Sequence, residues 1–161
     1  MNDDHVVPPV WRVVLAFAMT PLIAAAVLAV VQPLYAGLPS LADRISRTTF
    51  VYAFFGGYPA TVFLGIPAFL FLRNRVHLSA LNCAATGALV AAIPWLALGL
   101  FSNPDYAYGN GHVTHENGAK TFWGWVDLAT FTGQIAALGA LAGVAFWLIS
   151  ASGLKQKRKV P

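Results

Sequence analysis

Long uncharged stretches alternate with short polar or charged segments along this chain. Four stretches contain no Asp, Glu, Lys or Arg, and they are 30, 25, 29 and 27 residues long: residues 13–42, 48–72, 76–104 and 128–154. A helix needs about 20 apolar residues to cross a hydrocarbon core of about 30 Å. Each stretch is long enough for one crossing, and none comfortably fits two. The pattern therefore predicts four transmembrane helices, at about residues 11–31, 50–72, 78–101 and 123–149.

The segments between these stretches complete the predicted fold class. The segment LADRISR, residues 41–47, is expected to form a short interfacial helix before the second crossing, and residues 102–121 are expected to form a polar loop. The sequence therefore predicts an all-α integral membrane protein, in which four transmembrane helices form an up-down bundle. The whole chain, residues 1–161, is expected to be one membrane domain that ends in a basic cytoplasmic tail, residues 152–161.

The composition argues against a water-soluble globule. Hydrophobic residues make up 58% of the chain and charged residues only 10%, whereas soluble domains carry about 25% charged residues to solvate their surface. The single cysteine, Cys83, excludes an intramolecular disulfide and a metal site of several cysteines. Lys and Arg lie at the ends of the uncharged stretches, so membrane topology explains the net charge of +4 better than a nucleic-acid partner. No cofactor is expected.

The distribution of Lys and Arg predicts the orientation. Seven of these residues lie in the N-terminal segment, the second connection and the tail, and three lie in the first and third connections. Cytoplasmic segments of membrane proteins carry the excess of Lys and Arg. Both termini are therefore expected in the cytoplasm, with the protein in an inner membrane of the bacterial type. The basic tail is expected to contact anionic lipid, at about 1 kcal/mol per charge.

The stretch HVTHE holds the candidate metal ligands. His112 and His115 stand three residues apart, and Glu116 follows directly. Two imidazoles and a carboxylate suit a catalytic zinc ion that keeps one open position. However, neighbouring Gly and Asn residues argue against a helix that would align them, and the order differs from the His-Glu-x-x-His motif of zinc proteases. We therefore expect a hydrated loop without a metal and keep metal binding as the weaker hypothesis.

Asp127 is expected about one turn into the fourth transmembrane helix. A carboxylate within a membrane is costly unless it finds a partner. The cationic residues predicted on the same side of the membrane are Lys120, Arg44 and Arg47. Pairing or interfacial solvation is the simpler interpretation, because water and headgroups reach this shallow depth. A role in proton transfer or ligand binding is the alternative.

The fourth helix has a polar face and a small-residue face. Asp127, Thr130 and Gln134 follow helical spacing, and their face is expected to turn toward the bundle interior, where amides find hydrogen-bond partners. Gly139 and Gly143 form a GxxxG pair on nearly the opposite face. Such a pair lets another helix backbone come close, and we expect this helix to belong to the same chain rather than to a dimer partner.

Polar residues at comparable depths in the other helices outline a discontinuous track. These residues are Thr20, Thr61, Asn82 and Thr86. Such a track suits a conduction or substrate pathway. Ordinary hydrogen bonds between helices, worth about 0.5–2 kcal/mol each, need fewer assumptions. Gly57 and Gly65 belong to a ladder of small residues on the second helix, which suits close packing within the bundle.

The chain therefore offers several helix-packing surfaces but no reactive constellation. The sequence predicts a non-enzymatic integral membrane protein that acts as an accessory, scaffold or partner-binding subunit. Its expected partners are membrane lipid and either another membrane protein or a second copy of the chain. The alternative function is a small transporter or channel for a neutral or weakly polar solute. A metal-dependent enzyme built on the HVTHE stretch is the third hypothesis.

Overall fold

The computed structural model of the protein describes residues 8–73 and 78–152. Four helices in this part of the chain are long and apolar enough to cross a membrane: α1 (Val10–Val31), a helix that runs from α2 through α4 (Leu41–Leu72), α5 (Ala80–Phe101) and α6 (Phe122–Ser150). The prediction of a largely helical protein with four candidate membrane spans is therefore confirmed. Residues 153–161, almost all of the predicted basic tail, lie outside the described residues.

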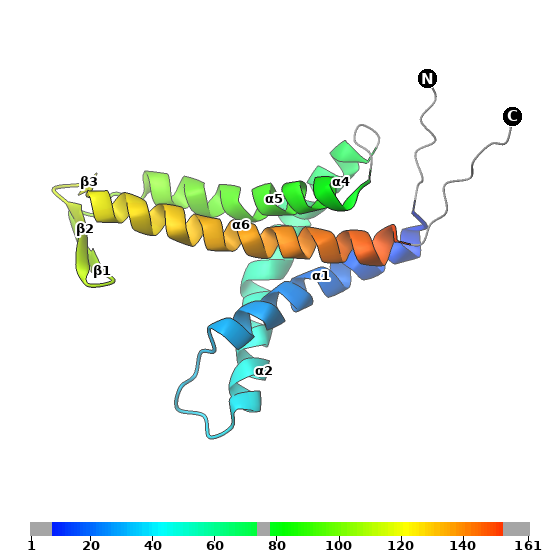
Figure 1. Cartoon of the computed structure of the whole chain (residues 1–161), viewed down its shortest axis with the longest axis horizontal. Coiled ribbons are helices and arrows are strands. Elements are labelled where there is room, and N and C mark those ends of the chain that lie inside the picture. Colours follow the sequence, from blue (N-terminus) through cyan, green and yellow to red (C-terminus); the bar gives the residue numbers. More distant parts are fainter. Residues whose placement is uncertain (1–7, 74–77, 153–161) are drawn as a thin grey trace, which may run out of the picture.

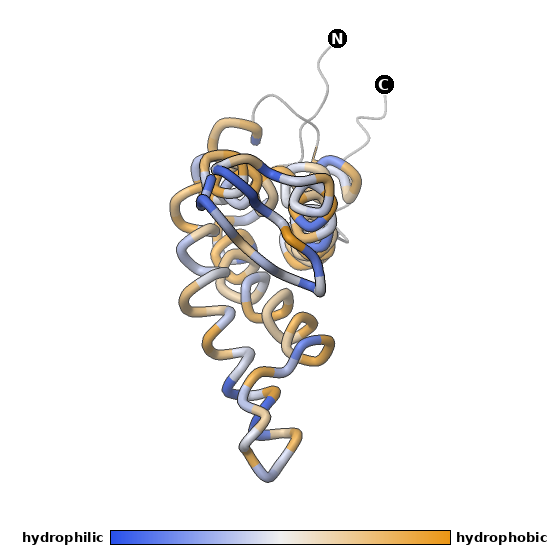
Figure 2. The backbone as a smooth tube through the Cα atoms, turned by 90° about the vertical axis from the view of Figure 1, so that its left-hand side faces the viewer, coloured by the Kyte–Doolittle hydropathy of each residue, from blue (hydrophilic) through white to orange (hydrophobic). Residues whose placement is uncertain are grey.

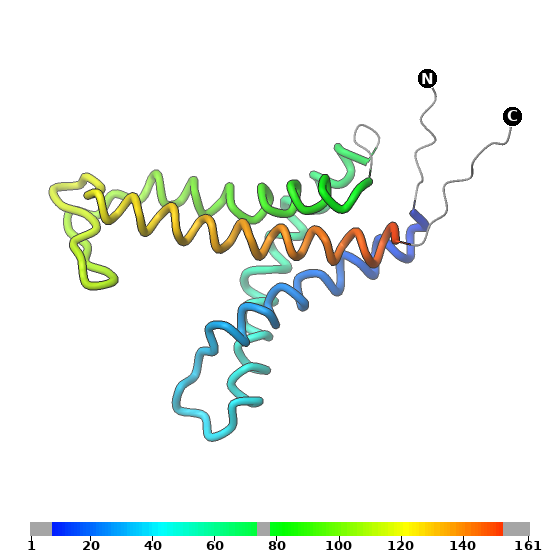
Figure 3. Tube along the Cα trace, in the orientation of Figure 1, coloured from blue at the N-terminus to red at the C-terminus, as the bar shows by residue number. Residues whose placement is uncertain are grey.

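The spans form an antiparallel pair that two further helices cross (Figure 1). α5 and α6 lie side by side along their length, and α1 packs against the part of α6 that is nearer its C-terminal end. The α2-to-α4 helix crosses the pair at a steeper angle. The beginning of α1, the end of α4, the beginning of α5 and the end of α6 all lie at one end of the molecule (Figure 3). At this end the Arg12 guanidinium donates a hydrogen bond to the Ser152 carbonyl, at 3.0 Å.

The second span is longer than a crossing requires and is irregular. Its segments are α2 (Leu41–Val51), the π-helical turn η1 (Tyr52–Gly57), α3 (Tyr58–Ala60), the π-helical turn η2 (Thr61–Gly65) and α4 (Ile66–Leu72). Each π-helical turn ends two residues before a proline, Pro59 or Pro67. Proline cannot donate to the carbonyl four residues earlier, and its ring clashes with that carbonyl. The wider π turn accommodates both prolines without ending the helix.

The start of this span differs from the sequence-based expectation. The 32 residues from Leu41 to Leu72 are continuous, and at 1.5 Å per residue they extend about 48 Å. LADRISR is therefore the beginning of the same continuous helix and not a separate helix, so the helix begins at Leu41 rather than near residue 50. The other three helices begin and end within about two residues of their expected bounds.

Small residues bring α1 close to the second span. A methyl group at Gly57 would lie 3.0 Å from Pro21 Cβ, so the two backbones already lie near contact at this point. One residue later the Tyr58 hydroxyl donates to the Ala18 carbonyl at 2.9 Å. Four buried alanines also belong to these two helices: Ala16, Ala25, Ala29 and Ala53. Small residues at helix contacts are typical of membrane proteins, because van der Waals contact replaces the hydrophobic driving force.

Three aromatic rings join α1, α4 and α6. The Phe17 ring centroid lies 5.6 Å from that of Phe69 and 4.8 Å from that of Phe146, and the last two rings are 5.5 Å apart. Such tilted and edge-to-face pairs are favourable geometries for aromatic rings. The cluster fixes the crossing of α1 over α6 and holds the end of the second span beside both helices.

α5 and α6 contact each other through their backbones. A methyl group at Gly87 would overlap the Gly139 carbonyl, and a methyl group at Gly139 would overlap the Gly87 carbonyl. One turn away, a methyl group at Gly143 would overlap the Cys83 carbonyl. Gly139 and Gly143 thus pack against a helix of the same chain, and their partner on α5, Gly87, is a residue that the sequence did not single out.

The predicted polar loop at residues 102–121 is instead a three-stranded antiparallel sheet, so the fold is not all-α. Its strands are β1 (Tyr106–Gly109), β2 (His112–Glu116) and β3 (Ala119–Lys120), in the order β1-β2-β3. Both turns are Asn-Gly pairs with positive φ: Asn110 (50°) and Gly111 (83°), then Asn117 (51°) and Gly118 (72°). Two-residue turns with positive φ at both positions match the twist of antiparallel strands.

Hydrophilic residues concentrate away from the apolar spans. Figure 2 shows them in the sheet, which faces the viewer, and near the beginning of α2 at the bottom of the view. The helices between these regions are predominantly hydrophobic. In Figure 1 the sheet lies at one end of the α5–α6 pair, and the beginning of α5 and the end of α6 lie at the other end.

Candidate functional site

Thr121 connects the sheet to α6. Its Oγ1 accepts a hydrogen bond from the Gly124 N–H at 3.2 Å, which caps the helix, and donates to the Val113 carbonyl at 2.6 Å. Its own N–H donates to the Thr114 carbonyl at 3.0 Å. An N-cap threonine satisfies one of the free N–H groups in the first helical turn. Here the same residue also fastens β2 to that turn.

A β-bulge at Thr114 seats the sheet on α6. Val113 pairs with Tyr108 and His115 pairs with Ala107, which leaves Thr114 without an opposite residue on β1. Its hydroxyl donates to the Ala107 carbonyl at 3.2 Å. Thr114 is buried, and a methyl group at Gly124 would overlap its carbonyl. Bulges re-aim side chains at the ends of sheets, and this one directs the centre of β2 onto the first turn of α6.

The bulge also sets the faces of the candidate metal ligands. Residues that pair across strands project to the same face. His112 pairs with Gly109 and His115 with Ala107, so both histidines lie on one face, whereas Glu116 pairs with Tyr106 and lies on the other. The three side chains are therefore not brought together. Within the described ranges, no group of three or more His, Cys, Asp or Glu is placed to hold a metal ion.

Each histidine has a local environment on α6 or the sheet. The His112 ring stacks on the Trp123 indole, with centroids 4.1 Å apart and planes 6° from parallel. His115 Nδ1 lies 3.4 Å from Thr114 Oγ1, and its Nε2 is enclosed without a hydrogen-bond partner. The His112 ring therefore lies at the junction between the sheet and α6, whereas the contact of His115 is within its own strand.

Asp127 pairs with an amide of the first Asn-Gly turn. Asn110 Nδ2 donates to Asp127 Oδ1 at 3.2 Å. Lys120, one of its expected partners, instead donates to the Ser102 carbonyl at 2.9 Å and to Asn103 Oδ1 at 2.8 Å. The expected ion pair of Asp127 with Lys120, Arg44 or Arg47 is therefore absent from the described part of the chain. The carboxylate holds the turn over α6.

Thr130 and Gln134 point away from the rest of the chain. Both side chains are exposed, and a methyl group at the neighbouring Gly133 would meet no atom within 4 Å. The expectation that this face turns into the bundle is therefore wrong. Packing explains the direction, because α6 presents Gly139 and Gly143 to α5, and the polar residues lie on nearly the opposite side of the helix. Within residues 8–73 and 78–152, this face of α6 is open.

The remaining residues of the expected polar track lie within the helix packing. Thr20, Thr61, Asn82 and Thr86 are all half-buried. The Thr20 hydroxyl is enclosed without a hydrogen-bond partner, and the Asn82 N–H donates to Ser79 Oγ at the start of α5, at 3.2 Å. A methyl group added at Gly65 would lie 3.7 Å from the Thr61 methyl group, so the two residues are neighbours on the same helix. These residues are thus separated from Thr130 and Gln134, which lie outside, and transport along the whole set stays a prediction.

Comparison with protein-family models, with curated proteins and with solved structures finds no match for this chain. The structure itself defines a class: a helical protein with four candidate membrane spans and a small sheet seated on the start of the last span. The candidate site within that class is the outward face of α6 around Gln134.

Proposed function

We propose that the chain is a non-enzymatic integral membrane protein that binds another membrane-embedded polypeptide as an accessory or scaffold subunit. The observation that supports this function is the exposed amide of Gln134, with exposed Thr130 one turn earlier. In lipid, polar side chains on helix surfaces form hydrogen bonds with neighbouring helices. A face that the chain itself leaves open is the place for such a neighbour.

The depth of Gln134 makes its exposure costly. At a rise of 1.5 Å per residue, Gln134 lies about 18 Å from the beginning of α6 and about 24 Å from its end. When the helix of about 42 Å is centred on a hydrocarbon core about 30 Å thick, Gln134 lies about 12 Å from the nearer surface, which is farther than a glutamine side chain extends. An amide without hydrogen-bond partners in an apolar medium costs several kcal/mol. A polypeptide that supplies a donor and an acceptor at this depth removes the cost.

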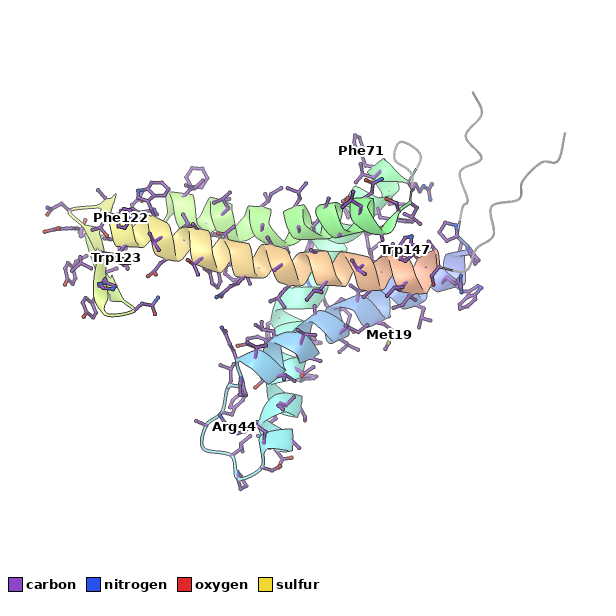
Figure 4. All side chains as sticks on the ribbon, viewed as in Figure 1. Met19, Arg44, Phe71, Phe122, Trp123 and Trp147 are labelled. Carbon is purple, nitrogen blue, oxygen red and sulfur yellow. The ribbon has the colours of Figure 1, made fainter. Side chains whose placement is uncertain are left out.

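The membrane placement that we propose is an up-down arrangement of the four spans, with both termini in the cytoplasm of a bacterial-type cell. The excess of Lys and Arg in the N-terminal segment, the second connection and the tail supports this orientation. Aromatic residues near the ends of α6 support the depth that we assign to this helix in the membrane, since Trp side chains favour membrane interfaces. Trp123 lies at the sheet end of α6 and Trp147 near the other end (Figure 4).

Native mass spectrometry of the chain, released from nanodiscs cut directly from its own membrane, tests the function. We expect the 17.2 kDa chain to leave the nanodisc bound to a polypeptide. Gln134→Leu should reduce the bound fraction, because leucine removes the amide and keeps the helix. Leu89→Ala changes an exposed apolar residue of α5 and should leave the bound fraction unchanged. A chain released only as a monomer with lipid would contradict the proposal.

A further inference from the structure

Some of the exposed residues of α6 line up as a stripe along the helix, beside the other exposed residues Ala129, Phe131 and Gly133. Its members are Asp127, Thr130, Gln134, Ala137, Leu141 and Leu148. All are exposed except Asp127, which is half-buried under its hydrogen bond from Asn110. Leu141 and Leu148 are 56% and 51% exposed. We call this set the outer stripe of α6.

The spacing within the outer stripe is compatible with a helix pair. Its positions advance by three and four residues in alternation from Asp127 to Leu141, and by seven from Leu141 to Leu148. The mean is 3.5 residues per turn, which keeps a contact continuous when two helices wrap around each other in a left-handed supercoil. Membrane helices commonly pair in this way, at a crossing angle of about 20°.

We propose that the outer stripe pairs with the outer stripe of a second copy of the chain, across a twofold axis along the membrane normal. This inference rests on the proposed partner-binding function and names the partner. Gln134 of each copy lies at the centre of the pair, and its amide hydrogen-bonds with the amide of Gln134 in the other copy. Thr130 and Ala137, one turn to either side, are small enough to let the two helices come close.

Two physical reasons favour a second copy over another partner. All copies of one chain enter the membrane in the same orientation, so Gln134 always lies at the same depth in both members of a parallel pair. A carboxamide also has donors and an acceptor, so two identical amides satisfy each other across a twofold axis, as in other isologous interfaces. A single polar residue at such a position sets the register and the number of helices in a coiled coil.

Asp127 marks the outer end of the paired region. It lies seven residues before Gln134, about 10 Å along the helix, at the level of the sheet. Its carboxylate accepts the hydrogen bond from Asn110, which turns it toward its own sheet. The two carboxylates of a pair therefore lie where water reaches them, and the close contact runs from Thr130 to Leu148.

Disulfide cross-linking in native membranes tests the pairing directly. Cys83 is the only cysteine, so Cys83→Ala gives a cysteine-free chain into which Ala137→Cys is introduced. Leu89→Cys is the matched control, because Leu89 is 59% exposed near the middle of α5. Mild oxidation should give a covalent dimer with Ala137→Cys and little with Leu89→Cys. Equal yields would show random collision and would overturn the proposal.

Variants of Gln134 test the amide. Gln134→Leu should weaken self-association in liposomes about tenfold, which corresponds to about 1.4 kcal/mol, because it removes both hydrogen bonds of the amide pair. Gln134→Asn keeps the carboxamide and should retain part of the association. Energy transfer between labelled copies measures both, and circular dichroism checks the helix content. If Gln134→Leu associates as strongly as the unchanged chain, the amide pair is not part of the interface and the proposal is overturned.

A photoreactive amino acid at Leu141 separates this inference from the proposed function. An adduct between two copies supports both. An adduct with a different polypeptide, without self-adducts, overturns the second copy as partner and leaves the partner-binding function standing. Adducts with lipid alone overturn both.

Discussion

The backbone contact between α5 and α6 predicts that Gly139→Ala destabilises the protein. A methyl group at Gly139 would overlap the Gly87 carbonyl and the Ala91 side chain. Carbon atoms in good contact are about 3.5–4.0 Å apart, so the two helices must separate by about 1 Å. Gly87 and Gly143 make the neighbouring contacts, and this movement loosens them as well.

The size of the effect follows from two opposing contributions. Overpacking of a well-packed interior costs about 1–3 kcal/mol, and contact with a backbone carbonyl favours the upper end because that atom cannot rotate away. Alanine in place of glycine in a helix stabilises the folded state by up to about 1 kcal/mol. We therefore expect Gly139→Ala to lower the free energy of unfolding by about 1–2 kcal/mol.

Unfolding by SDS in mixed micelles, followed by circular dichroism, measures this difference. Gly133→Ala is the matched control, because it makes the same change on the same helix where no atom lies within 4 Å of the added methyl group. It should be neutral or stabilising by up to about 1 kcal/mol. If Gly139→Ala unfolds at the same SDS fraction as Gly133→Ala, the two backbones are not in contact and the reasoning is refuted.

Three further predictions concern other contacts. Tyr58→Phe removes the hydroxyl that donates to the Ala18 carbonyl and should lower the free energy of unfolding by about 0.5–1.5 kcal/mol; an unchanged SDS midpoint would show that the bond contributes nothing. Gly124→Ala should separate the sheet from α6, because the added methyl group overlaps the Thr114 carbonyl. The Thr121 amide, which donates to that carbonyl, should then exchange its proton faster, and unchanged protection would contradict the close seating. In a Cys83→Ala background, Asn110→Cys should react with a membrane-impermeant maleimide in intact cells, whereas Arg73→Cys, from the other end of the spans, should react only after permeabilisation. The reverse pattern would contradict cytoplasmic termini.

The number of spans could be predicted because it depends on length and charge alone. The start of the second long helix could not be predicted, because hydropathy indicates which residues lie in lipid and not where a helix begins or ends. Asp43, Arg44 and Arg47 mark the place where the chain leaves the apolar region, but the backbone hydrogen bonds of the helix continue through them from Leu41. Charged residues end a membrane segment without ending the helix.

The sheet carried a sequence signal that the expectation of a loop passed over. Asn-Gly pairs, such as those at residues 110–111 and 117–118, are among the strongest hairpin signals, and the five residues of the HVTHE stretch separate the two pairs. The bulge at Thr114 had no such signal, because it depends on the contact of β2 with Gly124. The face of each histidine follows from that bulge and could not be obtained from spacing alone.

The direction of the polar face of α6 needed the structure for a different reason. Helical periodicity shows which residues share a face, but not whether that face points to another helix or to lipid. Contact between α5 and the Gly139–Gly143 face decides the rotation of α6 about its axis, since glycine allows the closest approach. Once that face is occupied, the polar residues on the other side must point outward.

The two faces of α6 therefore have separate roles that single substitutions can distinguish. Gly139 and Gly143 hold α6 against α5, and their contacts are complete within one chain. Gln134 is exposed, and within the described residues its amide has no hydrogen-bond partner, yet an amide at the proposed depth is costly when it stays alone. A change on the glycine face should thus alter unfolding of the chain itself, whereas a change at Gln134 should alter only what the folded chain binds. The amide stands at a position where leucine would suit lipid better, and the proposed contact with a second copy would give it a hydrogen-bond partner.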